Sequence, residues 1–249
     1  MIEVIDLVKK YPSNAGLRTI LDGINLEVRL GDRVGILGRN GAGKSTLVRM
    51  IAGAEPPTSG QIRRSMSVSW PLAFTGGFHG RLTGLDNLRF ICRIYGADFH
   101  EHLPFVEEFT ALGSYLDEPV MTYSSGMRAR LAFAISMTVD FDCYLVDEVM
   151  AVGDESFRER CQYELFEKRK DKTMVMVSHS RNYLQTNCNR FLLLRDGKII
   201  EYADPDEAYW DYKRMLLGPK ALEQRRQAKA KAKAKGEPLD ADASDPDEM

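Results

Sequence analysis

A glycine-rich stretch, GRNGAGKS at residues 38–45, carries the clearest chemistry in the sequence. It fits the pattern G-x-x-x-x-G-K-[ST], comes directly after the apolar run VGILG, and opens a helix-forming segment, TLVRMIAG. Glycines let such a loop curl until its N–H groups point at a phosphate, and the helix adds a partial positive charge. A chance glycine turn before a helix is the alternative, but the matching strand and helix favour a nucleotide-binding loop.

The side chains of this loop have separate expected roles. Lys44 is expected to bridge β- and γ-phosphate oxygens, Ser45 to bind Mg²⁺, and Thr46 to reach a further phosphate oxygen. Backbone N–H groups supply the other phosphate contacts. The residues predicted to bind nucleotide in this loop are Gly38, Arg39, Asn40, Gly41, Ala42, Gly43, Lys44, Ser45 and Thr46.

Two adjacent carboxylates end an apolar, strand-like run, CYLVDE at residues 143–148. Asp147 can hold the Mg²⁺ shell, and Glu148 can polarise an attacking water as a general base. Two acids that merely cap a strand are the alternative interpretation. Beside an intact phosphate-binding loop the catalytic interpretation is stronger, and it predicts hydrolysis of a Mg²⁺-bound nucleotide.

A sheet with parallel strands would bring these residues together. Strand patterns lie at residues 2–7, 19–28, 34–38, 143–148 and 173–179, and residues 190–202 fit a hairpin that turns at Asp196-Gly197. Residues 83–138 form a mostly helical section, in which Thr83 and Asp86 are expected to make the N-cap and capping box. Strands separated by helices predict an α/β fold with helices on the faces of the sheet.

The composition is typical of an ordinary soluble domain. The chain has 249 residues, of which 44% are hydrophobic and 28% charged, so it can bury a sizeable core and is neither disordered nor fibrous. A formal net charge of −2 argues against a nucleic-acid-binding protein that relies on overall positive charge. The four cysteines include no C-x-x-C pair and have no histidines at metal-ligand spacing, which predicts reduced thiols.

No targeting or membrane-spanning segment is expected. The N-terminus, MIEVIDLVKKYP, alternates like a strand and lacks the features of a signal peptide, and no apolar run approaches the roughly 18 residues that span a bilayer. Beyond residue 218 the composition changes abruptly, because QRRQAKAKAKAKG is basic and EPLDADASDPDEM is acidic. We therefore predict one folded domain over residues 1–217 and a disordered, charged tail over residues 218–249.

A loop like residues 38–45 also suits kinases, GTPases and recombinases, and a second motif decides between them. The segment YSSGM, residues 123–127, resembles the signature segment of ATP-binding-cassette (ABC) ATPases. It lies in the order typical of that family, between the phosphate-binding loop and the Asp-Glu strand, with His179 following on the next strand. The resemblance covers residues 1–217 and implies a P-loop NTPase fold with a RecA-like core, an antiparallel β subdomain and a helical subdomain over residues 83–138.

The same resemblance implies a homodimer that hydrolyses ATP with Mg²⁺. In ABC ATPases the signature faces the γ-phosphate bound by a second copy, so Tyr123, Ser124, Ser125, Gly126 and Met127 would complete the site of the partner. Serine hydroxyls, N–H groups and a helix N-terminus suit this role because together they form an anion receptor. Serines that are simple N-caps are the alternative, and they explain one serine but not the ordered set of motifs.

Further positions match the family one by one. Tyr11 stands where an aromatic ring stacks on adenine, and His179 stands where a histidine contacts the γ-phosphate and orients the water. Gly153 and Asp154 stand where a loop meets the other subunit, although Asp154 could also cap the helix that follows it. The expected catalytic residues are Lys44, Glu148 and His179.

One family position differs in this chain. Most ABC ATPases have a glutamine ahead of the helical section that touches Mg²⁺ or water, whereas here no glutamine lies between Gln61 and Gln162, and His79 is the nearest polar substitute. With this departure, the segments WPLAFTGGFHGRLTGLDN and DEVMAVGDESF make the chain similar to the ATPase subunits of polysaccharide exporters, especially the capsular exporters of Gram-negative bacteria.

This second resemblance implies a set of partners and a location. They are a membrane permease, further export proteins reached through it, and a lipid-linked acidic polysaccharide as cargo, at the cytoplasmic face of the inner membrane and without nucleic acid. Exporters of O-antigen or teichoic acid are close alternatives, and an importer would use the same ATPase. A soluble ABC ATPase of the repair or translation type is less well supported, because the sequence has no long coiled-coil insertion, zinc module or second cassette.

Overall fold

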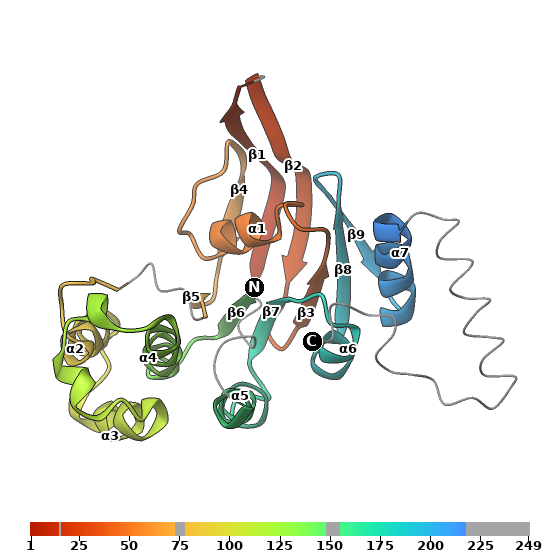
Figure 1. The fold of residues 1–249 in the computed structure, drawn as a ribbon. Coiled ribbons are helices and arrows are strands. Elements are labelled where there is room, and N and C mark those ends of the chain that lie inside the picture. Colours follow the sequence, from red (N-terminus) through yellow and green to blue (C-terminus); the bar gives the residue numbers. More distant parts are fainter. Residues whose placement is uncertain (15, 73–77, 148–154, 218–249) are drawn as a thin grey trace, which may run out of the picture.

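A mostly parallel sheet forms the centre of the computed structural model, which describes residues 1–14, 16–72, 78–147 and 155–217 (Figure 1). The six strands lie in the order β5-β6-β7-β3-β8-β9, and every neighbouring pair is parallel except the hairpin of β8 and β9. This arrangement confirms the α/β prediction. The strands are β3 (Arg33–Leu37), β5 (Val68–Pro71), β6 (Cys143–Asp147), β7 (Thr173–Val177), β8 (Arg190–Arg195) and β9 (Lys198–Tyr202).

A second, antiparallel sheet stands above the first in Figure 1. Its order is β2-β1-β4, with β1 at Ile2–Ser13, β2 at Gly16–Val28 and β4 at Ser59–Arg64. β1 and β2 are longer than the strands that the sequence pattern predicts. Their pairing is irregular, with shifts of register between Val4 and Leu7 and again further along β1. Each shift moves the alternation of side chains out of step, so a search for strict period-two alternation finds only part of each strand.

Two apolar cores hold these layers together. One lies between the two sheets and includes α1 (Lys44–Ile51), and the other covers the opposite face of the parallel sheet with α5 (Glu155–Gln162), α6 (Arg181–Asn187) and α7 (Pro205–Leu217). Strand β6 contributes Leu145 to the first core and Val146 to the second. Burial on both faces explains why the central strands are continuous apolar runs.

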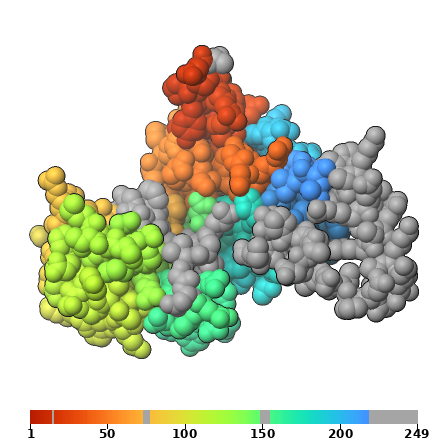
Figure 2. All heavy atoms as spheres, in the orientation of Figure 1, coloured from red at the N-terminus to blue at the C-terminus, as the bar shows by residue number. Residues whose placement is uncertain are grey.

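The predicted helical section forms a lobe at one side of the sheets. It contains α2 (Gly84–Tyr95), α3 (Phe99–Thr110) and α4 (Ser125–Met137), with short 3-10 turns η2 (Gly113–Asp117) and η3 (Val120–Thr122) between α3 and α4. The hydroxyl of Thr83 accepts a hydrogen bond of 3.0 Å from the Asp86 backbone N–H, which confirms the predicted N-cap. Figure 2 shows this yellow-green lobe projecting beside the rest of the molecule.

Helix α7 is the main element that the sequence interpretation did not include. Pro205 opens it, Asp206 and Glu207 occupy its first turn, and Arg214 lies in its last turn. These are ordinary signals of a helix, since proline suits the first position and the charges complement the helix dipole. None of the helices in the described part of the chain is long and apolar enough to cross a membrane.

Candidate nucleotide-binding site

The glycine-rich loop connects β3 to α1, and its three glycines are needed for different reasons. Gly41 and Gly43 have φ angles of 79° and 106°, in the left-handed region that favours glycine. A Cβ atom on Gly43 would also lie 2.7 Å from the side chain of Ile20. At Gly38 the reason is a close approach, because a Cβ atom there would lie 2.8 Å from the backbone oxygen of Leu194.

A cavity of about 440 Å³ opens in front of this loop. It is lined by residues of the loop, of β1 and β2, and of the end of β6. The lining residues are Tyr11, Ile20, Asn40, Gly41, Gly43, Lys44, Ser45, Thr46 and Asp147. All of these except Ile20 were predicted from the sequence as nucleotide or metal ligands, and the structure brings them to one site.

Lys44 is almost buried, with 7% of its surface exposed, and lies folded over the loop. Its ammonium donates hydrogen bonds to the backbone oxygens of Gly38 at 2.6 Å and Arg39 at 3.2 Å, and lies 3.4 Å from Nε2 of His179. A buried ammonium needs such acceptors because an unpaired buried charge is costly. Phosphate oxygens placed in the cavity would be stronger acceptors for the same group.

The register of the parallel sheet places two of the predicted site residues at one edge. Val177 of β7 pairs with Asp147 of β6 on one side and with Ile36 of β3 on the other. The glycine-rich loop starts beyond β3, and His179 lies two residues beyond Val177. Loop, carboxylate and histidine therefore meet at the carboxyl ends of adjacent strands, where open α/β sheets bind their ligands.

A network that sequence reasoning missed holds Tyr11 at the cavity. The Tyr11 hydroxyl donates to Oε1 of Glu55, which also receives Lys9 at 2.9 Å, while Arg49 reaches the other carboxylate oxygen at 3.1 Å. Arg49 also donates to the Thr46 hydroxyl at 3.3 Å, so the network joins the aromatic residue to the phosphate-binding helix. Glu55 lies 44 residues from Tyr11, and no local pattern in the sequence marks their contact.

Partners of the Glu55 carboxylate set its pKa. Burial raises the pKa, but hydrogen bonds from Tyr11, Lys9 and Arg49 outweigh burial and lower it from 4.5 to about 2. Because the pKa is lower in the folded chain, the stabilisation is fully present above about pH 4.5 and is lost as the pH falls towards 2. The network is therefore sensitive to acid.

Glu55→Gln should lower the free energy of unfolding by about 1–2 kcal/mol at pH 7, because the amide cannot replace the three charge-assisted contacts. The difference from the unmodified chain should shrink below pH 4.5, as the carboxylate of the latter becomes protonated in the unfolded state. Urea unfolding at a series of pH values measures both. Glu118→Gln, at an exposed position of the helical lobe, is the control. A pH-independent difference would contradict the assignment.

The predicted signature segment forms the start of α4. Ser124 is the N-cap, and its hydroxyl accepts a hydrogen bond of 3.2 Å from the Met127 backbone N–H. Ser124 and Ser125 are exposed and Gly126 is half-buried, whereas Tyr123 is buried in the core of the helical lobe. The cap alternative is thus correct for Ser124, whereas the exposed hydroxyl of Ser125 has no capping role and lies at a helix start, where the first N–H groups lack partners within the helix.

Some predicted residues lie outside the described part of the chain. They are the expected base Glu148 and the expected dimer-contact residues Gly153 and Asp154. His79, the suggested substitute for the missing glutamine, is described and exposed, and it does not line the cavity in front of the loop. The backbone of His79 is held by the side chain of Asn87, which accepts a hydrogen bond of 3.0 Å from the His79 N–H.

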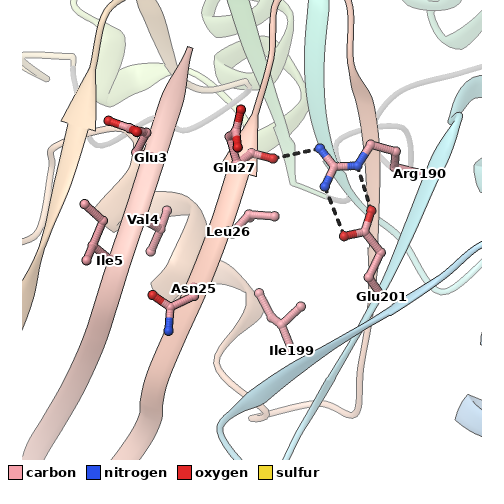
Figure 3. Close-up of a pocket in the computed structure, with 9 residues that line it drawn as sticks. All are labelled: Glu3, Val4, Ile5, Asn25, Leu26, Glu27, Arg190, Ile199 and Glu201. Carbon is pink, nitrogen blue, oxygen red and sulfur yellow. Dashed lines mark hydrogen bonds and ion pairs between the residues drawn. The ribbon is translucent and has the colours of Figure 1, made fainter.

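A second cavity of about 450 Å³ lies between the two sheets, away from the loop (Figure 3). Arg190 crosses it, donating to the Glu27 backbone oxygen at 2.7 Å and to the Glu201 carboxylate at 2.7 Å. The same guanidinium donates to Asp32 at 2.6 Å. None of the residues predicted to bind nucleotide lines this cavity, so it is a joint between the sheets rather than part of the site.

Comparison with known proteins decides the family. The family model described as "ABC transporter" matches residues 21–151. The chain belongs to the ABC transporter family. As an ABC ATPase, it binds and hydrolyses ATP. This family assignment explains why a phosphate-binding loop and an exposed helix start such as α4 occur in one chain, and it confirms the resemblance carried by residues 123–127.

Two relatives are similar over nearly their full length. This ABC ATPase is 57% identical over 212 residues to the ATP-binding protein BexA of Haemophilus influenzae, covering 85% of this chain and 98% of BexA. It is 55% identical over 215 residues to the capsule polysaccharide export ATP-binding protein CtrD of Neisseria meningitidis serogroup B, covering 86% of this chain and 100% of CtrD.

Solved structures support the fold of this ABC ATPase. The ATP-binding cassette MJ0796, determined as a dimer in a post-hydrolysis state with ADP and Pi, superposes with a TM-score of 0.69. The alignment covers 81% of this chain and 98% of that chain at 20% identity. At this identity the similarity concerns the fold, and it confirms the predicted ABC-type nucleotide-binding domain.

Proposed function

We propose that this ABC ATPase works as a homodimer that powers a separate membrane permease, exporting lipid-linked capsular polysaccharide from the cytoplasmic face of the inner membrane. The observation that carries the proposal is a site in two halves. The cavity in front of the phosphate-binding loop is lined by β1, β2, α1 and β6, and no residue of the signature segment lines it in the described part of the chain. In Figure 1 the loop before α1 and the start of α4 belong to different lobes.

Both halves are suited to bind an anion. The loop half ends in the Lys44 ammonium, and the α4 half ends in the exposed Ser125 hydroxyl and the N–H groups of a helix start. Both attract the same triphosphate, since helix N-termini and ammonium groups bind anions. Two ATP molecules held between two copies would satisfy all four halves, and loss of the γ-phosphate on hydrolysis would remove the bridge and open the dimer.

The loop half also has the ligands that Mg²⁺ prefers. Ser45 and Asp147 both line the cavity and offer a hydroxyl and a carboxylate oxygen, which with phosphate oxygens and water match the usual magnesium shell in P-loop ATPases. When bound, the metal would neutralise charge on the phosphates. Glu148 would take a proton from the attacking water, Lys44 would hold the γ-phosphate, and His179 would contact its oxygen. Gly153 and Asp154 would meet the other subunit.

The permease would dock beside the helical lobe, near residues 70–78 and 90–95. Helix α2 exposes Phe90, Ile94 and Tyr95, with relative exposures of 51%, 56% and 47%. Tyr95 also contacts Trp70 and Phe141, with ring centroids 5.5 Å apart in both pairs, so the exposed patch rests on a rigid aromatic base. Contiguous exposed apolar side chains are typical of surfaces that bind another protein.

The cargo assignment rests on the relatives. CtrD is named for capsule polysaccharide export, and the similarity to this chain extends over the full length of CtrD. Expression in a Neisseria meningitidis strain that lacks CtrD tests the proposal, with surface capsule as the measurement. Restored capsule, and recovery of an integral membrane permease with the chain from solubilised membranes, would support it. Recovery only with ribosomes or DNA would contradict it.

Ser125→Trp tests the two-copy site. Ser125 is exposed at the first turn of α4, so an indole there should block approach of a second copy and leave the fold intact. ATP binding by the single chain should stay within about twofold, whereas ATP-dependent dimerisation should be lost. Sedimentation with and without ATP separates these outcomes. Ser114→Trp, at an exposed serine of η2, is the control, and normal dimerisation of the Ser125 variant would contradict the model.

A further inference from the structure

His179 contacts the last described helix as well as the phosphate-binding loop. Its Nδ1 atom lies 2.7 Å from the hydroxyl of Tyr212 in α7, and the two rings are stacked with centroids 5.9 Å apart at 28°. Only 2% of Tyr212 is exposed. The imidazole is therefore held from both nitrogens, by a buried phenol at Nδ1 and by the Lys44 ammonium at Nε2, 3.4 Å away.

In the arrangement that the structure shows, the contact with Lys44 favours one position for the proton of the imidazole. An ammonium group has donors and no acceptor, so the Nε2 atom that faces it presents its lone pair. In a neutral ring the proton then lies on Nδ1, from which it is donated to the Tyr212 oxygen. In this state the phenol accepts.

A bound γ-phosphate would reverse this arrangement. Phosphate oxygens are acceptors, so His179 can contact them through Nε2 only when that atom carries the proton. Nδ1 of a neutral ring then has a lone pair and needs a donor. A carboxylate or a backbone carbonyl at this position could not donate, but the Tyr212 hydroxyl can rotate and do so.

We propose that Tyr212 is the positioning residue of His179, and that its hydroxyl allows the neutral imidazole to change tautomer when ATP binds. The ring gives up the Nδ1 proton to water and takes one from water at Nε2, so its charge does not change. Throughout, stacking and the hydrogen bond hold the ring plane. This inference rests on the proposed contact between His179 and the γ-phosphate.

Other contacts hold α7 in place independently of this hydroxyl. Asp211 of α7 accepts from Arg195 at 3.0 Å and from the Tyr202 hydroxyl at 2.5 Å. Asp206 accepts from Arg181 at 2.9 Å. Removal of the Tyr212 hydroxyl should therefore leave the helix docked, and Tyr202→Phe offers a matched control, because it removes a hydroxyl bonded to the same helix but not to His179.

Tyr212→Phe should lower kcat for ATP hydrolysis about tenfold and leave the equilibrium affinity for ATP within about twofold, as expected when the partner that orients a reactive group is lost. Tyr202→Phe should stay within about twofold of the unmodified chain in both quantities. In a His179→Ala background, Tyr212→Phe should have no further effect, since the phenol then has no imidazole to orient. An unchanged kcat, or an equal loss in Tyr202→Phe, would overturn the proposal.

The unsubstituted chain provides a direct measurement that does not depend on the folding of a variant. The ¹⁵N chemical shifts of the His179 ring report which nitrogen carries the proton, and comparison with His179→Ala assigns them among the four histidines. We expect the Nδ1–H tautomer without nucleotide and the Nε2–H tautomer with Mg²⁺ and a non-hydrolysable ATP analogue. A ring that keeps its Nδ1 proton in both states would overturn the tautomer change.

Failure of this inference and failure of the proposed site are distinguishable. If His179→Ala slows hydrolysis while Tyr212→Phe does not, the role of Tyr212 is wrong and the role of His179 stands. If His179→Ala hydrolyses ATP at the full rate, the proposed contact of His179 with the γ-phosphate is wrong, and the inference falls with it. ATP affinity and dimerisation, which depend on the loop and on α4, are measured separately in each variant.

Discussion

Glu148→Gln is expected to lower ATP turnover about 10²- to 10⁴-fold, the usual contribution of a positioned general base. The amide is the same size as the carboxylate and cannot take a proton from water. ATP affinity should stay within about threefold, because the residues proposed to hold the nucleotide lie in the loop before α1, in α1 and on β1 and β6. With ATP present and hydrolysis blocked, the dimer should persist.

Single-turnover hydrolysis and sedimentation measure these two effects together. Glu118→Gln, an exposed carboxylate of the helical lobe, is expected to behave as the unmodified chain. A Glu148→Gln chain with full activity would remove Glu148 as the base. A slow variant that stays monomeric with ATP would retain the base but contradict the two-copy site.

Lys44→Ala should weaken ATP binding roughly 10- to 100-fold, which corresponds to loss of one or two charge-assisted hydrogen bonds to phosphate. The fold should persist, because the Lys44 ammonium bonds to the backbone oxygens of Gly38 and Arg39 and lies near His179, and none of these three residues belongs to either apolar core. Equilibrium binding of a fluorescent ATP analogue measures the affinity, and circular dichroism checks the fold.

Lys10→Ala is the control for that variant, because Lys10 is an exposed lysine of β1 that does not line the cavity. Unchanged ATP affinity in Lys44→Ala would mean that the ammonium keeps its place on the backbone oxygens when nucleotide is bound. The loop alone would then carry the phosphate. Lys44→Arg, which keeps the charge but not the compact ammonium, should not restore affinity fully.

The parts of the site that the sequence predicts are those built from neighbouring residues. The loop at residues 38–45 needs its glycines, its lysine and its serine at fixed spacing, and Asp147 ends an apolar strand. His179 was assigned by resemblance, and the pairing of Asp147 and Ile36 with Val177 explains how it reaches the loop. Local spacing thus recovers what the backbone itself positions.

The parts that the sequence does not predict depend on contacts between distant elements. Ile20 reaches the cavity because β2 packs over the loop, and Glu55 reaches Tyr11 across 44 residues. Tyr212 meets His179 from a helix that carried ordinary start signals, so the helix was predictable but its contact was not. Tertiary packing determines side-chain pairs of this kind, and the local periodicity of a single sequence does not report on it.

The cavity in front of the phosphate-binding loop lies where the two sheets meet. Tyr11 and Ile20 belong to the antiparallel sheet, and the loop follows a strand of the parallel sheet. Arg190 of β8 joins the two sheets at another point, because it donates to the backbone oxygen of Glu27 in β2 and to the carboxylate of Glu201 in β9. A nucleotide that contacts both sheets would join them at a second point, and its binding free energy would add to the stability of the folded chain. Thermal melting should therefore report adenine contact and phosphate contact together, as one stabilisation of the folded chain.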